Sequence, residues 1–126
     1  MNVKIDTKEI FHVISILDTD LTANMSASFM AIIAKKQEED AKSLILDLAH
    51  INSIDLSFAA CLTLLSSQIY AEQKSFVICN LKESVKEKLA EWSILDELNT
   101  TPTESEAWDI VQMEEIEREL GAEFPE

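Results

Sequence analysis

The chain opens with two segments in which apolar and polar residues alternate, separated by a polar turn at residues 7 and 8. Alternation with a period of two is typical of a strand with one buried face, so residues 2–6 and 9–17 are predicted to form a pair of strands. The second segment has the denser apolar run. It is therefore predicted to be the more deeply buried of the two.

After residue 20 the apolar spacing becomes that of amphipathic helices, separated by short apolar runs. The nearly continuous apolar run at residues 43–48 is typical of a central strand covered on both faces. A last helix is predicted after Pro102, where Thr103 and Glu106 form a capping-box pattern. The other predicted elements are helices at 22–40, 57–72 and 83–92, a strand at 75–80, and a short strand or turn at 93–98.

Strands that alternate with helices imply right-handed crossovers, so we predict an α/β fold with a mixed, mostly parallel sheet and helices packed on it. The opening strand pair adds an antiparallel edge. The 126 residues are enough for one core, which we place at residues 1–112. Residues 113–126 are strongly acidic and are predicted to form a solvated helix end and a frayed tail.

Composition narrows the class of protein. A hydrophobic fraction of 47% is that of a globular chain, and no apolar run approaches the roughly 18 residues of a membrane span. The N-terminus has no signal-peptide pattern, so we expect a soluble, cytoplasmic protein without membrane insertion. The formal net charge of −14 argues against nucleic acid and favours a basic protein partner, although solubility alone would explain the charge equally well.

Several kinds of site lack the residues that they need. Gly121 is the one glycine, which excludes dinucleotide-binding fingerprints, phosphate-binding loops and nucleophile elbows, because all of these need several glycines. Cys61 and Cys79 have no second cysteine or histidine at metal-ligand spacing, so they are predicted to be small apolar core residues. No metal or cofactor is indicated.

Catalytic groups are sparse. The alternation of His12 with apolar neighbours predicts an edge or surface position. Ser57 and His50, with Asp47 or Asp55, could be written as a hydrolase triad, but no oxyanion hole is indicated. We therefore expect a protein that is not an enzyme, and a small hydrolase using these residues is the least favoured hypothesis.

The segment INSIDLSFAACL, residues 51–62, leads from a predicted loop into a helix. On a helical wheel Phe58, Cys61 and Leu62 fall on the core side, together with Leu65 and Ile69. The opposite arc carries mostly small residues, which would allow another protein to approach closely. This predicted partner-binding face consists of Ala60, Thr63, Leu64 and Ser67.

Ser57 lies at the border between these two arcs, in the first turn of the helix. Unpaired amides and the helix dipole favour an added negative charge there, so phosphorylation at Ser57 would be accommodated and would change the neighbouring face. The alternative is that Asp55 or Ser57 only caps the helix.

The central segment LILDLAHINSIDLSFAACLTLL resembles the hallmark of the STAS domain, in which a strand ending in Asp-Leu is followed by a turn and then by Asp, a hydroxyl residue, Ser or Thr, and Gly. Asp47-Leu48, Ile54-Asp55 and Ser57 stand at matching positions. The resemblance extends over residues 2–111, and SFVICNLKESVKEKLAEWSILDEL is similar to the family's next strand, helix and short strand. It implies a STAS-like fold.

For STAS domains that act as anti-sigma factor antagonists, the resemblance implies that Ser57 is the residue phosphorylated by a partner serine kinase. That kinase is itself an anti-sigma factor, and the unphosphorylated domain binds it and frees a sigma factor. Asp55 and an earlier loop aspartate, Asp18 or Asp20, would lie near the phosphosite.

The alternative implied by the same resemblance is a constitutive accessory subunit of a lipid-transport ABC system, which docks without phosphorylation. Leu56 stands where the family has its first hydroxyl residue, and Phe58 stands where it has glycine. Both replacements favour this second version.

Overall fold

The computed structural model describes residues 1–123, so the last three residues of the predicted tail lie outside it. The strands are β1 (Val3–Thr7), β2 (Phe11–Ile16), β3 (Asp20–Leu21), β4 (Ser43–Asp47), β5 (Ser53–Ile54), β6 (Phe76–Cys79) and β7 (Asn99–Thr101). The helices are α1 (Ser26–Glu39), α2 (Leu56–Ala71), α3 (Glu83–Glu91) and α4 (Glu104–Glu123), with 3₁₀ turns η1 (Ala23–Met25) and η2 (Leu95–Glu97).

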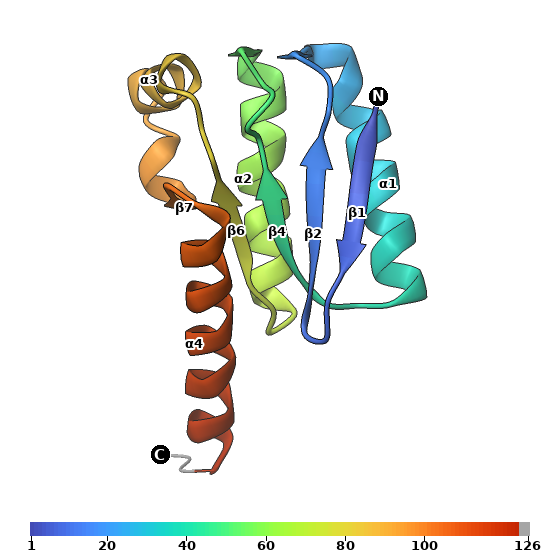
Figure 1. Cartoon of the computed structure of the whole chain (residues 1–126), viewed down its shortest axis with the longest axis vertical. Helices are drawn as coiled ribbons and strands as arrows, with labels where there is room; N and C mark the ends of the chain where they lie inside the picture. Colours follow the sequence, from blue (N-terminus) through green and yellow to red (C-terminus); the bar gives the residue numbers. More distant parts are fainter. Residues whose placement is uncertain (124–126) are drawn as a thin grey trace.

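Five strands form the main sheet in the order β1-β2-β4-β6-β7. The β1–β2 pair is antiparallel, and the remaining three pairs are parallel. The predicted mixed, mostly parallel sheet with an antiparallel edge is therefore confirmed. Figure 1 shows α1 and α2 behind the sheet and α4 on the opposite face, near β6 and β7.

The larger core lies between the sheet and the helices α1 and α2. Phe29 of α1 and Phe58 of α2 are fully buried, and their ring centroids are 5.2 Å apart. They pack with side chains that alternate along the three inner strands, as the apolar patterns predicted. The strand residues of this layer are Ile14, Ile16, Leu44, Leu46, Phe76 and Ile78.

The second core lies between the sheet and α4. Ala107 and Val111 are fully buried, four residues apart on one side of the helix. Trp108 meets Phe11 edge-on with the ring centroids 5.0 Å apart. The other strand residues of this layer are Val13, Ile45, Val77 and Cys79. Since β4 contributes to both cores, the prediction of a central strand covered on both faces is confirmed.

The prediction of an edge or surface position for His12 is wrong, because its side chain is fully buried. Strand β2 is paired on both sides, and His12 points to the face covered by α1. Its Nε2 donates to the carbonyl oxygen of Asp40, which ends that helix, at 2.8 Å, and its Nδ1 lies 2.9 Å from Thr7 Oγ1. Both ring nitrogens are thus hydrogen-bonded, which makes burial of this polar side chain possible.

The segment at residues 93–98, predicted to be a short strand or turn, forms the 3₁₀ turn η2. The edge strand β7 follows it and was not predicted. Its three polar residues have no apolar alternation, and only backbone pairing with β6 makes them a strand.

Helix α4 begins as predicted after Pro102, where the Glu106 amide donates to Thr103 Oγ1 at 3.2 Å. It continues without a break past the predicted domain boundary at residue 113. Figure 1 shows its C-terminal half extending beyond the end of the sheet. No helix within residues 1–123 is both long enough and apolar enough to cross a lipid bilayer.

The packing of Phe58 predicts a large effect of its removal. Phe58→Ala should lower the free energy of unfolding by about 3–5 kcal/mol, because it leaves a cavity against Phe29. Urea unfolding, followed by circular dichroism, would measure this change. Leu64→Ala, on the exposed side of the same helix, is the control and should change the free energy by less than about 0.5 kcal/mol. Equal effects of the two substitutions would show that Phe58 is not packed as described.

Candidate functional site

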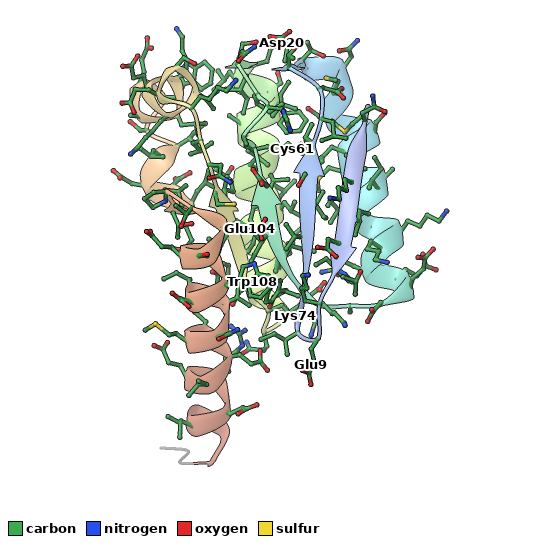
Figure 2. All side chains as sticks on the ribbon, in the orientation of Figure 1. Glu9, Asp20, Cys61, Lys74, Glu104 and Trp108 are labelled. Atoms are coloured by element: carbon green, nitrogen blue, oxygen red, sulfur yellow. The ribbon has the colours of Figure 1, made fainter. Side chains whose placement is uncertain are left out.

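The candidate site lies at the edge of the sheet where the parallel strands β2 and β4 end. The chain leaving each of these strands forms a two-residue strand, and the two, β3 and β5, pair in parallel with Asp20 opposite Ser53. Helix α2 begins directly after β5. Figure 2 shows Asp20 at this end of the molecule. Two loops that are distant in sequence are thereby held side by side at the entrance to α2.

Asp20 is tied to the neighbouring loop by its side chain. Its Oδ1 accepts a hydrogen bond from Ser53 Oγ, and its Oδ2 accepts one from Thr19 Oγ1 at 3.1 Å. These two hydroxyl donors lower the pKa of Asp20 below its usual value, and Ser53 has the larger effect. The carboxylate is therefore fully ionised at neutral pH and adds a fixed negative charge to the site.

The structure places the two candidate loop aspartates differently. Asp18 Oδ1 accepts a hydrogen bond from the backbone amide of Asn2 at 2.7 Å, so this carboxylate faces the start of the chain. Asp20, by contrast, bonds to the loop that leads into α2. Of the two, Asp20 has the direct connection to the candidate site.

Asp55 occupies the N-cap position of α2, but its carboxylate does not cap that helix. Asp55 Oδ2 accepts a hydrogen bond from the amide of Ala23 at 2.9 Å, and its own amide donates to the carbonyl oxygen of Leu21 at 2.8 Å. The structure therefore differs from the capping interpretation of Asp55. Pairing of β3 with β5 brings the start of η1 alongside, and Asp55 satisfies an amide there.

Ser57 and Leu56 form the exposed first turn of α2. The first amide with a helical acceptor here is that of Ala59, which donates to the Asp55 carbonyl at 3.0 Å. The preceding amides form the positive end of the helix dipole, beside the Ser57 hydroxyl. Within residues 1–123 that hydroxyl has no hydrogen-bond partner, and Phe58 is turned into the core, away from it.

The predicted partner-binding face of α2 is largely exposed. Ala60 and Ser67 are exposed, Leu64 is 55% exposed, and Thr63 is half-buried because it lies beside the chain that follows α3. A hollow of about 510 Å³ is lined by Thr63, Leu64 and Ser67, together with Glu97 of η2. The face is therefore a shallow concave surface with one large apolar side chain.

The buried side of α2 differs in part from the helical-wheel prediction. Cys61, predicted to be a core residue, is only half-buried. Ala59 and Ser66, on the other border of the predicted core arc, are buried instead. The helical wheel predicted the buried side of the helix correctly. It assigned small residues to the exposed side, however, whereas the close approach of α2 to the sheet buries Ala59 and Ser66.

Two residues of this surface were not identified from the sequence. Leu56 is 53% exposed next to Ser57, although it was interpreted only as a departure from the family pattern. An apolar residue one position before the predicted phosphosite was the available signal. Glu97 gave no signal in the sequence, because only the η2 turn brings it beside α2.

Asn52 connects this edge to α3. Its backbone amide donates a hydrogen bond to the carbonyl oxygen of Thr19 at 2.6 Å, and its side-chain Oδ1 accepts one from Lys82 Nζ at 2.6 Å. Ser84 Oγ donates to its carbonyl oxygen at 3.1 Å. The beginning of α3 is thereby fixed to the loop between β4 and β5, so three segments converge at the candidate site.

The structure gives the hypothetical triad no support. Asp47 Oδ1 accepts hydrogen bonds from the amide of Ala49 at 2.9 Å and from Asn80 Nδ2 at 3.1 Å, so it orders the ends of β4 and β6. His50 is exposed, and among the described residues no hydrogen bond joins it to Ser57 or Asp47. The residues of the hypothetical triad are therefore not connected by hydrogen bonds.

Thiol chemistry is also disfavoured. Burial raises the pKa of Cys79 to about 12, with smaller contributions from the charges of Asp47 and Glu104. Burial likewise raises the pKa of Cys61 above its usual value. Both thiols are therefore protonated at neutral pH. Within residues 1–123, no group of three or more His, Cys, Asp and Glu side chains could hold a metal ion.

Comparison with protein families matches residues 4–107 to the STAS domain. Comparison with curated proteins gives no match.

Several solved structures share the fold. A serine-to-glutamate variant of RsbS from Moorella thermoacetica is 19% identical, with a TM-score of 0.74 over 89% of this chain and 96% of that one. The anti-sigma factor antagonist SpoIIAA in its unphosphorylated form is 16% identical, with a TM-score of 0.72 over 88% and 96% of the two chains. The phosphorylated form of SpoIIAA from Bacillus is 15% identical, with a TM-score of 0.64 over 87% and 99%.

The hydrogen bonds of Asp20 lead to a prediction about its titration. Ser53→Ala removes the larger of the two effects that lower its pKa, so the pKa of Asp20 should rise toward 3.8. The lowered pKa stabilises the fold above about pH 4 and loses that effect as the pH falls through the folded-state value. NMR of the side-chain carboxyl carbon as a function of pH would measure the shift. Ser67→Ala, an exposed serine on α2, is the matched control and should leave the titration unchanged.

Proposed function

The chain belongs to the STAS domain family, and on that premise we propose that it is a protein-binding regulator of the anti-sigma factor antagonist type, switched by phosphorylation of Ser57. The partner would be an anti-sigma factor serine kinase in the cytoplasm. The observation that carries the proposal is the exposed, unpaired hydroxyl of Ser57 in the first turn of α2, at the family's phosphosite position and beside an exposed helix face.

The chemistry required at Ser57 is simple. The hydroxyl oxygen attacks the terminal phosphorus of the kinase's nucleotide, the bond to the leaving diphosphate breaks, and the hydroxyl proton passes to a base of the kinase. The first-turn amides and dipole of α2 stabilise the phosphate that is formed. The chain therefore supplies an acceptor and a suitable electrostatic environment, and the partner supplies the catalytic groups.

Phosphorylation would act on docking through local charge. A phosphate adds about 1.5–2 negative charges at neutral pH, one residue away from the exposed Leu56 and one turn from Ala60. A partner packed on this face would have to desolvate that charge, which is costly without a cation opposite it. The unphosphorylated form is therefore the binding form in this proposal.

The bulky Phe58 does not stand against it. In STAS antagonists the residue after the phosphosite is glycine, and a large side chain there could block the kinase. Phe58 is fully buried against Phe29, so it leaves Ser57 accessible.

A second candidate function is a constitutive docking subunit without a phosphorylation switch. It is favoured by the exposure of two leucines, Leu56 at 53% and Leu64 at 55%, on the same side of α2. An apolar side chain directly before Ser57 increases the area that a permanent partner could bury. In this version Ser57 stays unmodified and the α2 face alone determines binding.

A direct test incubates the protein with each histidine-kinase-like serine kinase of its own genome and nucleotide. We expect one of them to add a single phosphate, detected by intact-mass spectrometry, and Ser57→Ala to abolish it. Ser105→Ala, which changes an exposed serine in the first turn of α4 and outside the candidate site, should still be phosphorylated. No phosphate at Ser57 with any of these kinases would reject the switch, and a stable complex without modification would favour the second candidate.

A separate test concerns the docking face. Leu64→Glu places a charge in the hollow on α2 and should weaken the complex with the kinase by on the order of a hundredfold, measured by isothermal titration calorimetry. The control is Leu17→Glu, which changes a 45% exposed leucine that follows β2 and does not line the hollow. If both variants bind like the unmodified chain, the α2 face is not the docking surface.

A further inference from the structure

Helix α4 has a second apolar side that the fold does not use. Met113, Ile116 and Leu120 are 56%, 55% and 49% exposed, and their spacing of three and four residues places them on one side of the helix. Ala107 and Val111, which bury α4 against the sheet, lie on the other side. We call the first three residues the α4 stripe. It presents three large apolar side chains in a row to the solvent.

The orientation of the stripe is fixed by polar contacts behind it. Glu114 Oε1 accepts a hydrogen bond from the hydroxyl of Tyr70 at 2.8 Å, and Arg118 Nη2 donates to Ser75 Oγ at 3.1 Å. These residues fall on the same side of α4 as Val111. The helix cannot turn its stripe toward the sheet without breaking both contacts.

The stripe also lies outside what the domain itself requires. The match to the STAS domain ends at residue 107, and the last buried apolar residue of α4 is Val111. The helix nevertheless continues to Glu123, about three more turns. Figure 1 shows this half extending past the end of the sheet, where it is accessible from several directions. Packing in the core therefore does not explain why this half of the helix has apolar side chains.

Charge indicates what would cover the stripe. Glu117 and Glu119 flank it, one on each side, and Asp109 lies in line with it one turn before Met113; all three carboxylates are exposed. The one basic residue of α4, Arg118, is on the sheet side and pairs with Glu115 at 3.0 Å. A second copy of the helix would bring like charges together, whereas a helix with lysines or arginines beside its apolar residues would find opposite charges on both flanks.

We propose that the α4 stripe docks a basic amphipathic helix of a partner protein. Met113, Ile116 and Leu120 would anchor its apolar side, as in helix pairs where residues at i, i+3 and i+7 interlock, and the acidic flanks would select its basic rim. Methionine adapts its shape to different partners more readily than branched residues. This surface lies on the other face of the sheet from the α2 face, so the proposal goes beyond the switch at Ser57 and does not depend on it.

The test uses the full chain and a synthetic, fluorescein-labelled helical peptide with leucines at i, i+3 and i+7 and lysines on both flanks. Fluorescence anisotropy should show saturable binding that weakens with salt, because charges at the rim are screened. The double substitution of Ile116→Gln and Leu120→Gln should weaken binding by on the order of tenfold or more. Glutamine is a good helix former, and circular dichroism would verify that the helix is retained.

Two controls separate this proposal from its alternatives. Leu64→Gln changes an equally exposed leucine on α2 and should leave peptide binding unchanged. A peptide of the same composition with its leucines scattered around the helix should bind at least about tenfold more weakly. Equal binding of both peptides, or of the double variant, would overturn the proposal, because attraction of charge alone would then account for it. A dimer of the unmodified chain that the double variant loses in analytical ultracentrifugation would overturn it in favour of a second copy.

Discussion

The structure depends on the burial of β4 on both faces and its pairing on both edges. Leu44 and Leu46 face one helical layer and Ile45 the other, and all three are almost fully buried. A strand in this position has no water for its backbone, so β2 and β6 must pair with it and helices must cover both faces. Right-handed parallel crossovers then bring the loops after β2 and β4 to one edge of the sheet, where sites of open α/β sheets form. The entrance to α2 lies at that edge for this reason.

The sequence predicted those elements of the fold whose formation depends on the periodicity of apolar residues. The four helices, the central strand and the antiparallel edge were predicted because their side chains alternate or recur with the period of the element. The same patterns did not reveal β3, β5 and β7, since two or three residues are too few to show an apolar alternation and become strands only through a partner distant in sequence. His12 was misplaced for a related reason. A polar residue between apolar ones suggests exposure, and only the fold brings the carbonyl oxygen of Asp40 to its ring.

The candidate site was predictable as a position but not as a surface. The family pattern pointed to Ser57 and the helical wheel to the outer face of α2. Neither could show that Asp55 serves the amide of Ala23 instead of its own helix, nor that Glu97 completes the hollow beside Leu64. The two departures from the family pattern also have different consequences in space. Phe58 is buried in the core, whereas Leu56 is exposed at the surface and adds to the apolar area that a partner would cover.

The acidic charge of the chain bears on its two surfaces in different ways. A phosphate on Ser57 would add about two charges to a formal net charge of −14, so the long-range field that attracts a basic partner would hardly change. A switch at Ser57 therefore has to act at short range, through desolvation at the first turn of α2. Attraction along α4 depends instead on the fixed carboxylates beside the stripe. Helices α2 and α4 pack on opposite faces of the sheet and touch through the hydrogen bond from Tyr70 to Glu114. That contact involves neither the stripe nor the carboxylates that flank it, so a partner on the α2 face leaves the charges beside the stripe in place.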